Sequence, residues 1–445
     1  MTALARLIVR CCIAALILAT GTAGSGGCAR KLMATPAIAQ NGLIDPFQYV
    51  PPKFQATTVP VFVASTRTVS GNDDPARYYT AKRSPEVRLG LATVDLAVGQ
   101  SWQELLQESR TLDRKTNPTL KLVSYQDFGP LWTSVWPTDY RFHRQPSLPN
   151  IDRGPAERCV KEMNALLDAS RRKQITIFVH GFNTFYEDNL FIAAEFWHFM
   201  GHDGVIMSFD WPSAGSLFSY QVDKANADFS QRQFRELLEF LGANTTATSI
   251  NILAHSAGGP IVAEALRQLS LKYYDLDDSE IRRRLKIGRV VLAAPDLDSG
   301  SAISAAVDGA GRVTQGVALY ASKGDIALNF SSGIFGSTRL GDSIGKLPPD
   351  LRDSVIRNKL EWVDATAAKR EFPTFLGHSY FYDNPWVSSD IMLFMALGAN
   401  QDERGLVRDE KTGFLVFPKD YAAKMPAIAA DLIAKYPPRV RAPDG

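Results

Sequence analysis

One short segment of the chain combines a serine with the small neighbours that an exposed nucleophile requires. Residues 254–259, Ala-His-Ser-Ala-Gly-Gly, follow the apolar run at 249–254 and precede a helical pattern over 260–270. This order predicts a strand, a sharp turn and a helix, with Ser256 at the tip of the turn. The N-terminus of the helix would favour negative charge beside the serine. We interpret Ser256 as a candidate nucleophile, although a serine after a strand can also be no more than a helix N-cap.

A serine nucleophile needs a base, and the chain offers a single histidine after Ser256. When the serine sits on such a turn, the acid and then the histidine follow it in the chain. His378 is that histidine, and it lies in a loop after the last predicted strand. We therefore predict that His378 accepts the serine proton. His180 precedes the serine, and we interpret it as a structural residue that fixes its own loop.

Aspartates after two successive predicted strands compete for the role of the acid. Asp325 follows the run at 316–321, and Asp298 follows the run at 289–294. We favour Asp325, because the acid most often follows the strand just before the one that leads to the histidine. Asp298 is the alternative, whereas Asp296 is better suited to tightening a Pro-Asp turn. The acid would orient the imidazole and stabilise the imidazolium that forms when the serine loses its proton.

Backbone amides at two positions are candidates for binding an oxyanion. The run at 175–179 ends in His180-Gly181-Phe182, where a loop can supply one donor, and the residue after the nucleophile supplies the other. We predict that the amides of Phe182 and Ala257 hold the oxyanion of a tetrahedral intermediate. Losing one such donor in a serine enzyme costs about 3 kcal/mol of transition-state stabilisation.

The elements that must position these residues alternate along the chain. Apolar runs recur at 175–179, 205–209, 249–254, 289–294, 316–321 and 360–364, and two further predicted strands lie at 59–64 and 88–96. Between the runs lie helical patterns, for instance at 187–200, 223–241 and 260–270. Strands that are apolar throughout and alternate with helices predict an α/β fold, with a mostly parallel central sheet covered by helices on both faces.

Several of these segments together resemble the α/β-hydrolase superfamily, and more closely a bacterial family of α/β hydrolases of unknown function. The resembling segments span 61–67, 178–183, 208–213, 254–258, 292–298, 320–325 and 377–379. The resemblance covers roughly residues 57–400 and implies a triad of Ser256, Asp325 and His378. The sequence departs from the family at 257–259, where Ala-Gly-Gly replaces a Met-Gly-Asn-like sequence. The family does not fix a substrate.

The N-terminus has the features of an export signal. Arg6 and Arg10 precede a short apolar run at 11–20, and small residues lead to Cys28. We predict a signal peptide at 1–27, since the run is too short to span a membrane. Residues 25–28, Ser-Gly-Gly-Cys, resemble a bacterial lipobox, with Ser25 in place of the usual aliphatic residue. We expect lipidation of Cys28 and a cell-envelope lipoprotein of the periplasm or outer membrane; the alternative is ordinary cleavage, for instance after Ala39, and secretion.

The rest of the chain divides by composition. We predict a linker or N-terminal arm at 28–55 and a hydrolase domain at 56–400 with a possible insertion around 111–155. A C-terminal extension follows at 401–445. The stretch at 70–83 is polar and is predicted as a loop.

Composition excludes several classes of protein. Apolar residues make up 45% and charged residues 22%, which is typical of a globular chain. The net charge of +2 offers no field for nucleic acid. The four cysteines lack zinc-ligand spacing, and neither a metal nor an organic cofactor is expected.

The combined features predict a serine hydrolase that cleaves a small-molecule ester or lipid through an acyl-enzyme. The alternatives are an acyltransferase or peptidase on the same triad, or a catalytically inactive binding protein with the same fold. The membrane would be a partner through the lipid anchor if Cys28 is modified. The oligomeric state is left open.

Overall fold

A single large sheet organises the protein. The computed structural model describes residues 30–131, 152–215, 219–323, 325, 360–372 and 378–436. Within these ranges, eleven strands form one sheet in the order β10-β11-β9-β8-β7-β6-β4-β5-β1-β2-β3. The strands are β1 (Thr58–Val69), β2 (Tyr79–Asp95), β3 (Lys121–Pro130), β4 (Gln174–Val179), β5 (Val205–Asp210), β6 (Ser249–His255), β7 (Ile287–Ala293), β8 (Gly316–Ala321), β9 (Leu360–Asp364), β10 (Val407–Arg408) and β11 (Leu415–Val416).

The centre of the sheet is parallel and its edges are antiparallel. Every pairing from β1 through β5, β4, β6, β7, β8 and β9 to β11 is parallel. At one edge β2 and β3 continue from β1 in antiparallel pairing, and at the other β10 pairs antiparallel with β11. Parallel neighbours bring their carboxyl ends to one edge of the sheet, where ligands of such folds bind. The predicted fold class is confirmed.

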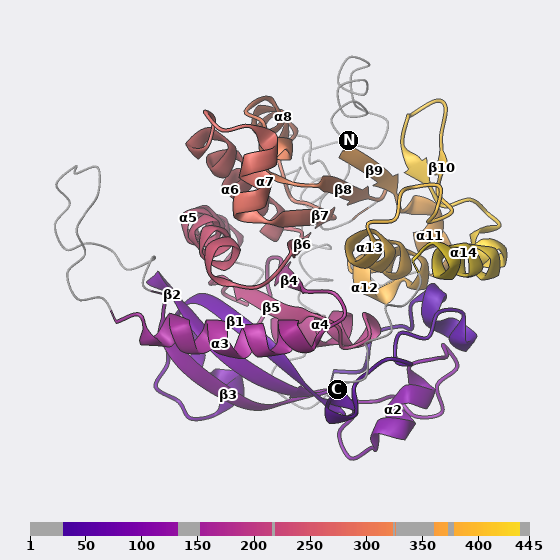
Figure 1. Cartoon of the computed structure of the whole chain (residues 1–445), viewed down its shortest axis with the longest axis horizontal. Coiled ribbons are helices and arrows are strands. Elements are labelled where there is room, and N and C mark those ends of the chain that lie inside the picture. The colour runs from indigo at the N-terminus through magenta and orange to yellow at the C-terminus, as the bar shows by residue number, and fades with distance from the viewer. Residues whose placement is uncertain are drawn as a thin grey trace, which may run out of the picture.

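Helices cover both faces of this sheet (Figure 1). One apolar core contains residues of α2, α4 and α11 to α14, and the other contains residues of α3, α5, α6 and α7. The helices are α2 (Trp102–Glu108), α3 (Gly154–Ala169), α4 (Tyr186–Phe199), α5 (Tyr220–Asn244), α6 (Gly258–Lys272), α7 (Asp278–Leu285), α8 (Ser299–Val307), α11 (Thr366–Glu371), α12 (Tyr380–Asp383), α13 (Pro385–Leu397) and α14 (Tyr421–Lys435). Burial on two faces explains why the central parallel strands are largely apolar.

Alternation along β1 shows how one strand serves both cores. Val61 and Val63 lie in one core, whereas Phe62 and Ala64 lie in the other. Successive side chains of a strand point to opposite faces, so a strand between two helical layers needs apolar residues at every position. Helix α13 is also surrounded by protein on nearly every side. Its residues 385–395 are all buried, and apolar or small side chains cover almost all of its circumference.

The structure differs from the sequence-based division in three places. The predicted loop at 70–83 is shorter, because β2 begins at Tyr79. Part of the segment at 111–155 is β3, which pairs with β2, while residues 132–151 lie outside the described residues. Residue 400 marks no structural boundary, since β10 and β11 extend the same sheet and α14 packs into its core.

The segment predicted as a linker is packed against the domain. Leu32, Met33 and Phe47 are buried, and all three belong to the core that contains α4 and α13. The amide of Met33 donates a hydrogen bond of 2.5 Å to the buried carboxylate of Glu195 in α4. The guanidinium of Arg30 donates to the other oxygen of the same carboxylate at 3.2 Å. From Arg30 onward, therefore, the described part of this segment is a component of the fold. The predicted signal peptide and Cys28 lie outside the described residues.

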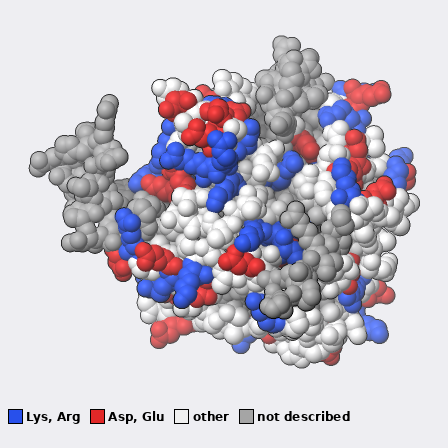
Figure 2. Space-filling model, in the orientation of Figure 1, with Lys and Arg blue, Asp and Glu red and all other residues white. Residues whose placement is uncertain are grey.

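Charges of both signs are interspersed over the face seen in Figure 2, with Lys and Arg concentrated over α7. Part of that positive charge is paired, since Arg282 and Arg312 both contact the carboxylate of Asp278. In the part of the chain that the structure describes, no helix has the length and apolar character needed to cross a bilayer.

Candidate active site

The predicted turn at Ser256 joins β6 to α6 at the carboxyl edge of the sheet. Ser256 has a φ of +50°, a left-handed conformation that is uncommon for a residue with a side chain. Its amide donates to the carbonyl of Ala293 at 3.0 Å, and its carbonyl accepts from the amide of Asp296 at 3.1 Å. These two bonds hold the strained residue against the end of β7. Strain of this kind persists only where the surroundings enforce it, which makes the turn a functional candidate.

Small residues around the turn allow the backbone segments to approach. A Cβ atom added at Gly258 would lie 2.6 Å from the carbonyl oxygen of Val179. A Cβ at Gly181 would lie 2.9 Å from the Cβ of Ser256. Both positions therefore need glycine if the loop after β4 is to lie against the serine. The sequence pattern pointed to this packing only for the residues that follow the serine.

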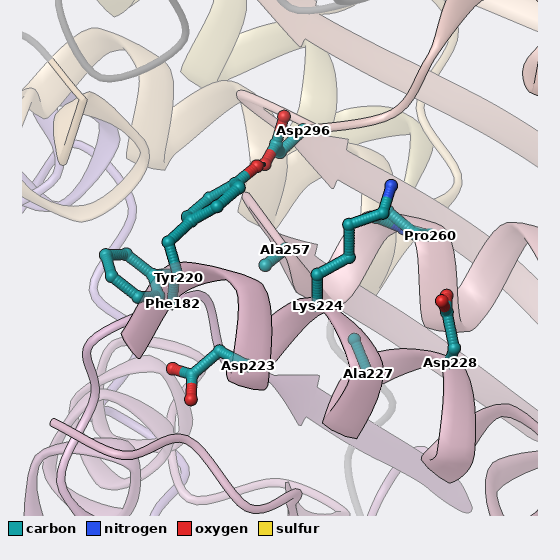
Figure 3. A pocket seen from close by; sticks show the side chains of 9 residues that line it. All are labelled: Phe182, Tyr220, Asp223, Lys224, Ala227, Asp228, Ala257, Pro260 and Asp296. Carbon is teal, nitrogen blue, oxygen red and sulfur yellow. Dashed lines mark hydrogen bonds between the residues drawn. The ribbon is translucent and has the colours of Figure 1, made fainter. Parts of the chain in front are cut away.

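The two residues that would supply the oxyanion donors line one small cavity. Phe182 and Ala257 both line a cavity of about 40 Å³, which Figure 3 shows from close by. Among the described residues, neither amide donates to a backbone carbonyl. Amides in the first turn of a helix have no partner within the helix, so Ala257 is suited to receive an anionic oxygen.

His378 and Asp325 are brought together although 53 residues separate them. The Nδ1 atom of His378 lies 2.7 Å from the Oδ2 atom of Asp325, a distance expected for a charge-assisted hydrogen bond. The aspartate side chain is completely buried, and the histidine side chain is 16% exposed. With Nδ1 engaged by the carboxylate, Nε2 is the ring nitrogen left to exchange a proton with a substrate or a serine.

The two other aspartates considered from the sequence have different partners. Asp298 is the N-cap of α8 and accepts a hydrogen bond of 3.0 Å from the amide of Ser301. Asp296 accepts a hydrogen bond from the hydroxyl of Tyr220. Of the three carboxylates, Asp325 is the one bonded to His378.

His255 connects the serine turn to the segment that carries His378. The rings of His255 and His378 have centroids 4.7 Å apart, and Nε2 of His255 lies 3.2 Å from the carbonyl oxygen of His378. On its other side the His255 ring stacks on Phe381 at 4.5 Å. Burial, together with the nearby His378, lowers the pKa of His255 well below its usual value. His255 is therefore a neutral residue that is suited to donate to the His378 carbonyl.

The serine turn and the segment of His378 are joined through His255, the residue before the serine. Within the described residues, the Ser256 hydroxyl makes no hydrogen bond to the His378 ring. Such bonds are often long in an enzyme without substrate and shorten in the complex. In the same ranges, no group of three or more His, Cys, Asp or Glu is arranged to hold a metal ion.

A buried ion pair beneath the loop of Phe182 was not foreseen from the sequence. Arg67 at the end of β1 donates to the carboxylate of Asp210 at the end of β5, at 3.0 Å, and both side chains are buried. The same guanidinium donates to the carbonyls of Ser213 at 3.0 Å and Thr184 at 3.2 Å. Thr184 lies two residues after Phe182, so Arg67 joins two loops at the edge of the site.

His180 belongs to this network as well. Its Nδ1 lies 2.8 Å from the carbonyl oxygen of Gly181, and its Nε2 lies 3.1 Å from that of Trp211. Its ring is buried and stacks on Trp211 at 4.9 Å. Burial alone would raise the pKa of Asp210, but Arg67 and the hydrogen bond with His180 hold it below its usual range. No local signal pointed to the ion pair, because an arginine near the end of a strand is ordinary on a protein surface.

The parallel sheet, the strained turn after β6 and the helix behind it define the class of the protein as an α/β hydrolase. The family model described as "Alpha/beta hydrolase of unknown function (DUF900)" matches residues 156–395, and the chain belongs to this family. The resemblance seen in the sequence is thereby confirmed, and it supports a hydrolase.

Solved structures with a similar arrangement include two esterases. Esterase B from Lactobacillus rhamnosis is 12% identical, with 61% of this chain and 80% of that chain covered and a TM-score of 0.30. A thermophilic esterase from the Planctomycetes species Thermogutta terrifontis is 14% identical, with 51% and 82% covered and a TM-score of 0.27. A comparison with curated proteins found no match. Identity and TM-score are low for both structures, so neither bears on the substrate of this protein.

Proposed function

We propose that the protein is a serine hydrolase that cleaves carboxylic esters, with Ser256 as nucleophile, His378 as base and Asp325 as the acid that orients it. The observation that carries this proposal is the 2.7 Å bond between His378 and Asp325 beside a strained serine turn. A carboxylate that holds a histidine at the edge of such a turn is the arrangement that activates a serine hydroxyl.

The first half of the reaction forms an acyl-enzyme. The Ser256 Oγ atom bonds to the ester carbonyl carbon, and Nε2 of His378 takes the hydroxyl proton. The carbonyl π electrons move onto oxygen, where the amides of Phe182 and Ala257 stabilise the negative charge. When the carbon–oxygen bond to the alcohol breaks, the leaving oxygen receives the proton from His378.

The second half regenerates the enzyme with water. His378 removes a proton from water as the water oxygen bonds to the acyl carbon, and the serine oxygen leaves with the proton that His378 returns. The buried charge of Asp325 stabilises the imidazolium in both halves. An alcohol or amine that replaced this water would turn the same chemistry into acyl transfer.

The test uses p-nitrophenyl acetate with the protein that starts after residue 28. We expect a burst of p-nitrophenolate equal to the enzyme concentration, or steady turnover, which Ser256→Ala removes completely. Asp325→Asn should lower kcat by about 10⁴-fold, because the imidazole loses the partner that sets its tautomer. Circular dichroism of each variant checks that the fold is intact.

Asp298→Asn is the matched control for Asp325→Asn. Asparagine also caps helices, so this variant should retain wild-type kcat. A large loss in Asp298→Asn with normal activity in Asp325→Asn would reverse the assignment of the acid. If the folded wild-type protein hydrolyses no ester and forms no acyl-enzyme, the proposed function is wrong, and a binding protein with this fold becomes the better hypothesis.

We further propose that the protein is exported and anchored through a lipidated Cys28. The packing of the N-terminal arm supports this over cleavage after Ala39, because that cleavage would remove Leu32 and Met33 from the core. It would also remove the amide that bonds to the buried carboxylate of Glu195. Labelling with radioactive palmitate in a bacterial host should mark the wild type and leave Cys28→Ala unmarked. A mature N-terminus at residue 40 would contradict the proposal.

A further inference from the structure

The cavity next to the oxyanion donors is bounded by a tyrosine from another part of the chain. Figure 3 shows Tyr220 extending from the start of α5 toward Asp296, with Phe182 on one side of it and Ala257 on the other, toward Lys224. Asp296 and Ala257 belong to the serine side of the site, whereas Phe182 belongs to the loop after β4. Tyr220 therefore lines the cavity together with the two residues that would supply the oxyanion donors.

Contacts at both ends fix the position of the Tyr220 side chain. Its hydroxyl donates a hydrogen bond to the carboxylate of Asp296. Its ring packs edge-on against the ring of Phe182, with centroids 5.2 Å apart. Asp296 is itself tied to the turn, because its amide donates to the Ser256 carbonyl at 3.1 Å. The ring cannot move away from the cavity without breaking a hydrogen bond or an aromatic contact.

The space that Tyr220 leaves is small. The cavity measures about 40 Å³, and a site for one water needs roughly 10–15 Å³ on the same scale. It therefore has room for about three non-hydrogen atoms, which is the size of an acetyl group. A longer acyl chain bound beside these residues would have to displace the tyrosine ring or extend over the exposed side of the cavity, where Lys224 and Asp228 lie.

Charged side chains along α5 also disfavour a long acyl chain. Lys224 and Asp228 line the same cavity and are exposed, and the Asp296 carboxylate is at its other side. An alkyl chain laid over these groups would displace their water without offering hydrogen bonds in return. The small size of the cavity and the charge of its lining thus both disfavour a long acyl chain.

We propose that Tyr220 is a specificity-determining residue that restricts the enzyme to esters of short acyl groups, of about acetyl size. This inference rests on the proposed function, since it concerns the acyl group that Ser256 would receive. Tyr220 limits the acyl group through the position of its ring, and Asp296 holds that ring in place. Tyr220 takes no part in proton transfer.

The experiment compares kcat/KM for p-nitrophenyl acetate, butyrate and octanoate, which share one leaving group. We expect the wild type to favour acetate over octanoate by at least about 100-fold, because a single methylene that does not fit a binding pocket changes kcat/KM by about 10- to 200-fold. Tyr220→Ala should lower this ratio at least tenfold by raising the octanoate value. Tyr220→Phe keeps the ring and loses the bond to Asp296, so the ratio should fall by about fivefold.

Tyr273→Ala is the matched control, because Tyr273 is half-buried at the end of α6 and bonds to Glu239, away from the cavity. It should leave the acetate-to-octanoate ratio at the wild-type value. Tyr220→Phe changes only a hydroxyl, so it provides a folded variant even if Tyr220→Ala does not fold.

The outcomes separate this inference from the proposed function. If the wild type cleaves all three esters equally, or if both Tyr220 variants keep the wild-type ratio, the inference is wrong while ester hydrolysis through Ser256 stands. If no ester is cleaved by any variant and no acyl-enzyme forms, the proposed function fails and this inference fails with it.

Discussion

Replacing Arg67 by methionine tests whether the ion pair with Asp210 holds the edge of the site together. Methionine fills much of the same volume but cannot neutralise the carboxylate or donate to the carbonyls of Ser213 and Thr184. The Arg67 side chain is 4% exposed and that of Asp210 is fully buried. Removing one partner of such a pair typically costs about 3–5 kcal/mol. We expect Arg67→Met to lower the free energy of unfolding by about that amount.

Arg88→Met provides the control, since Arg88 pairs with Asp127 across β2 and β3 where the side chains are 29% and 20% exposed. Water screens this pair, so its loss should cost about 0–1 kcal/mol. Urea unfolding, followed by tryptophan fluorescence, measures the free energy of unfolding of both variants. The slope of this free energy against urea concentration should be the same in the variants and the wild type. If Arg67→Met and Arg88→Met differ by less than 1 kcal/mol, the reasoning from burial is refuted.

The pH dependence of the free energy of unfolding is a second measurement on Arg67→Met. In the wild type the pKa of Asp210 is held below its usual range by Arg67 and His180, against the effect of burial. The charged carboxylate therefore stabilises the fold near neutral pH, and this contribution is lost on acidification. Without the guanidinium, burial prevails and raises the pKa, so the native variant takes up a proton before the unfolded chain does. The stability gap to the wild type should narrow as the pH falls from 7 to 5, and adding Asp210→Asn should recover part of it at neutral pH.

Two further predictions concern buried histidines. His255→Phe keeps the stack on Phe381 but removes the bond to the His378 carbonyl, so kcat should fall about fivefold with KM unchanged; a change confined to KM would contradict this positioning role. His202 is buried against Trp197, and burial lowers its pKa to about 4 from a usual 6.5. The unfolded chain therefore binds this proton first, and stability should fall by up to about 3 kcal/mol as the pH drops from 6.5 toward 4. His202→Gln should flatten that slope in urea titrations, and an unchanged slope would show that other groups cause it.

Local patterns in the sequence predicted the elements that hold the site with little error. The strand predicted at 249–254 is β6 (Ser249–His255), and the helix predicted at 260–270 is α6 (Gly258–Lys272). Both predictions succeed because a strand buried on both faces is largely apolar, and a helix repeats its apolar residues every three to four positions. The requirement at Ser256 is equally local, because a sharp turn depends on its immediate neighbours.

The N-terminal arm could not be recognised in this way. Its buried residues, among them Leu32, Met33 and Phe47, follow neither a strand nor a helix period, because most of this segment packs without regular structure. Its hydrogen bonds go to partners such as Glu195, 162 residues away. A pattern of Pro and scattered apolar residues therefore predicted a linker where the structure has part of the core.

Arg67 and Tyr220 show why residues around a predicted site are harder to find than the site itself. The partner of Arg67 is 143 positions away and becomes a neighbour only because β5 lies next to β1 in the sheet. Tyr220 reaches Asp296 across 76 positions in the same way. Neither contact has a local signature, since arginine at a strand end and tyrosine at a helix start are ordinary on a protein surface. The order of the strands decides whether such a residue is solvated or buried in the site, and a chain-local pattern carries no information on that order.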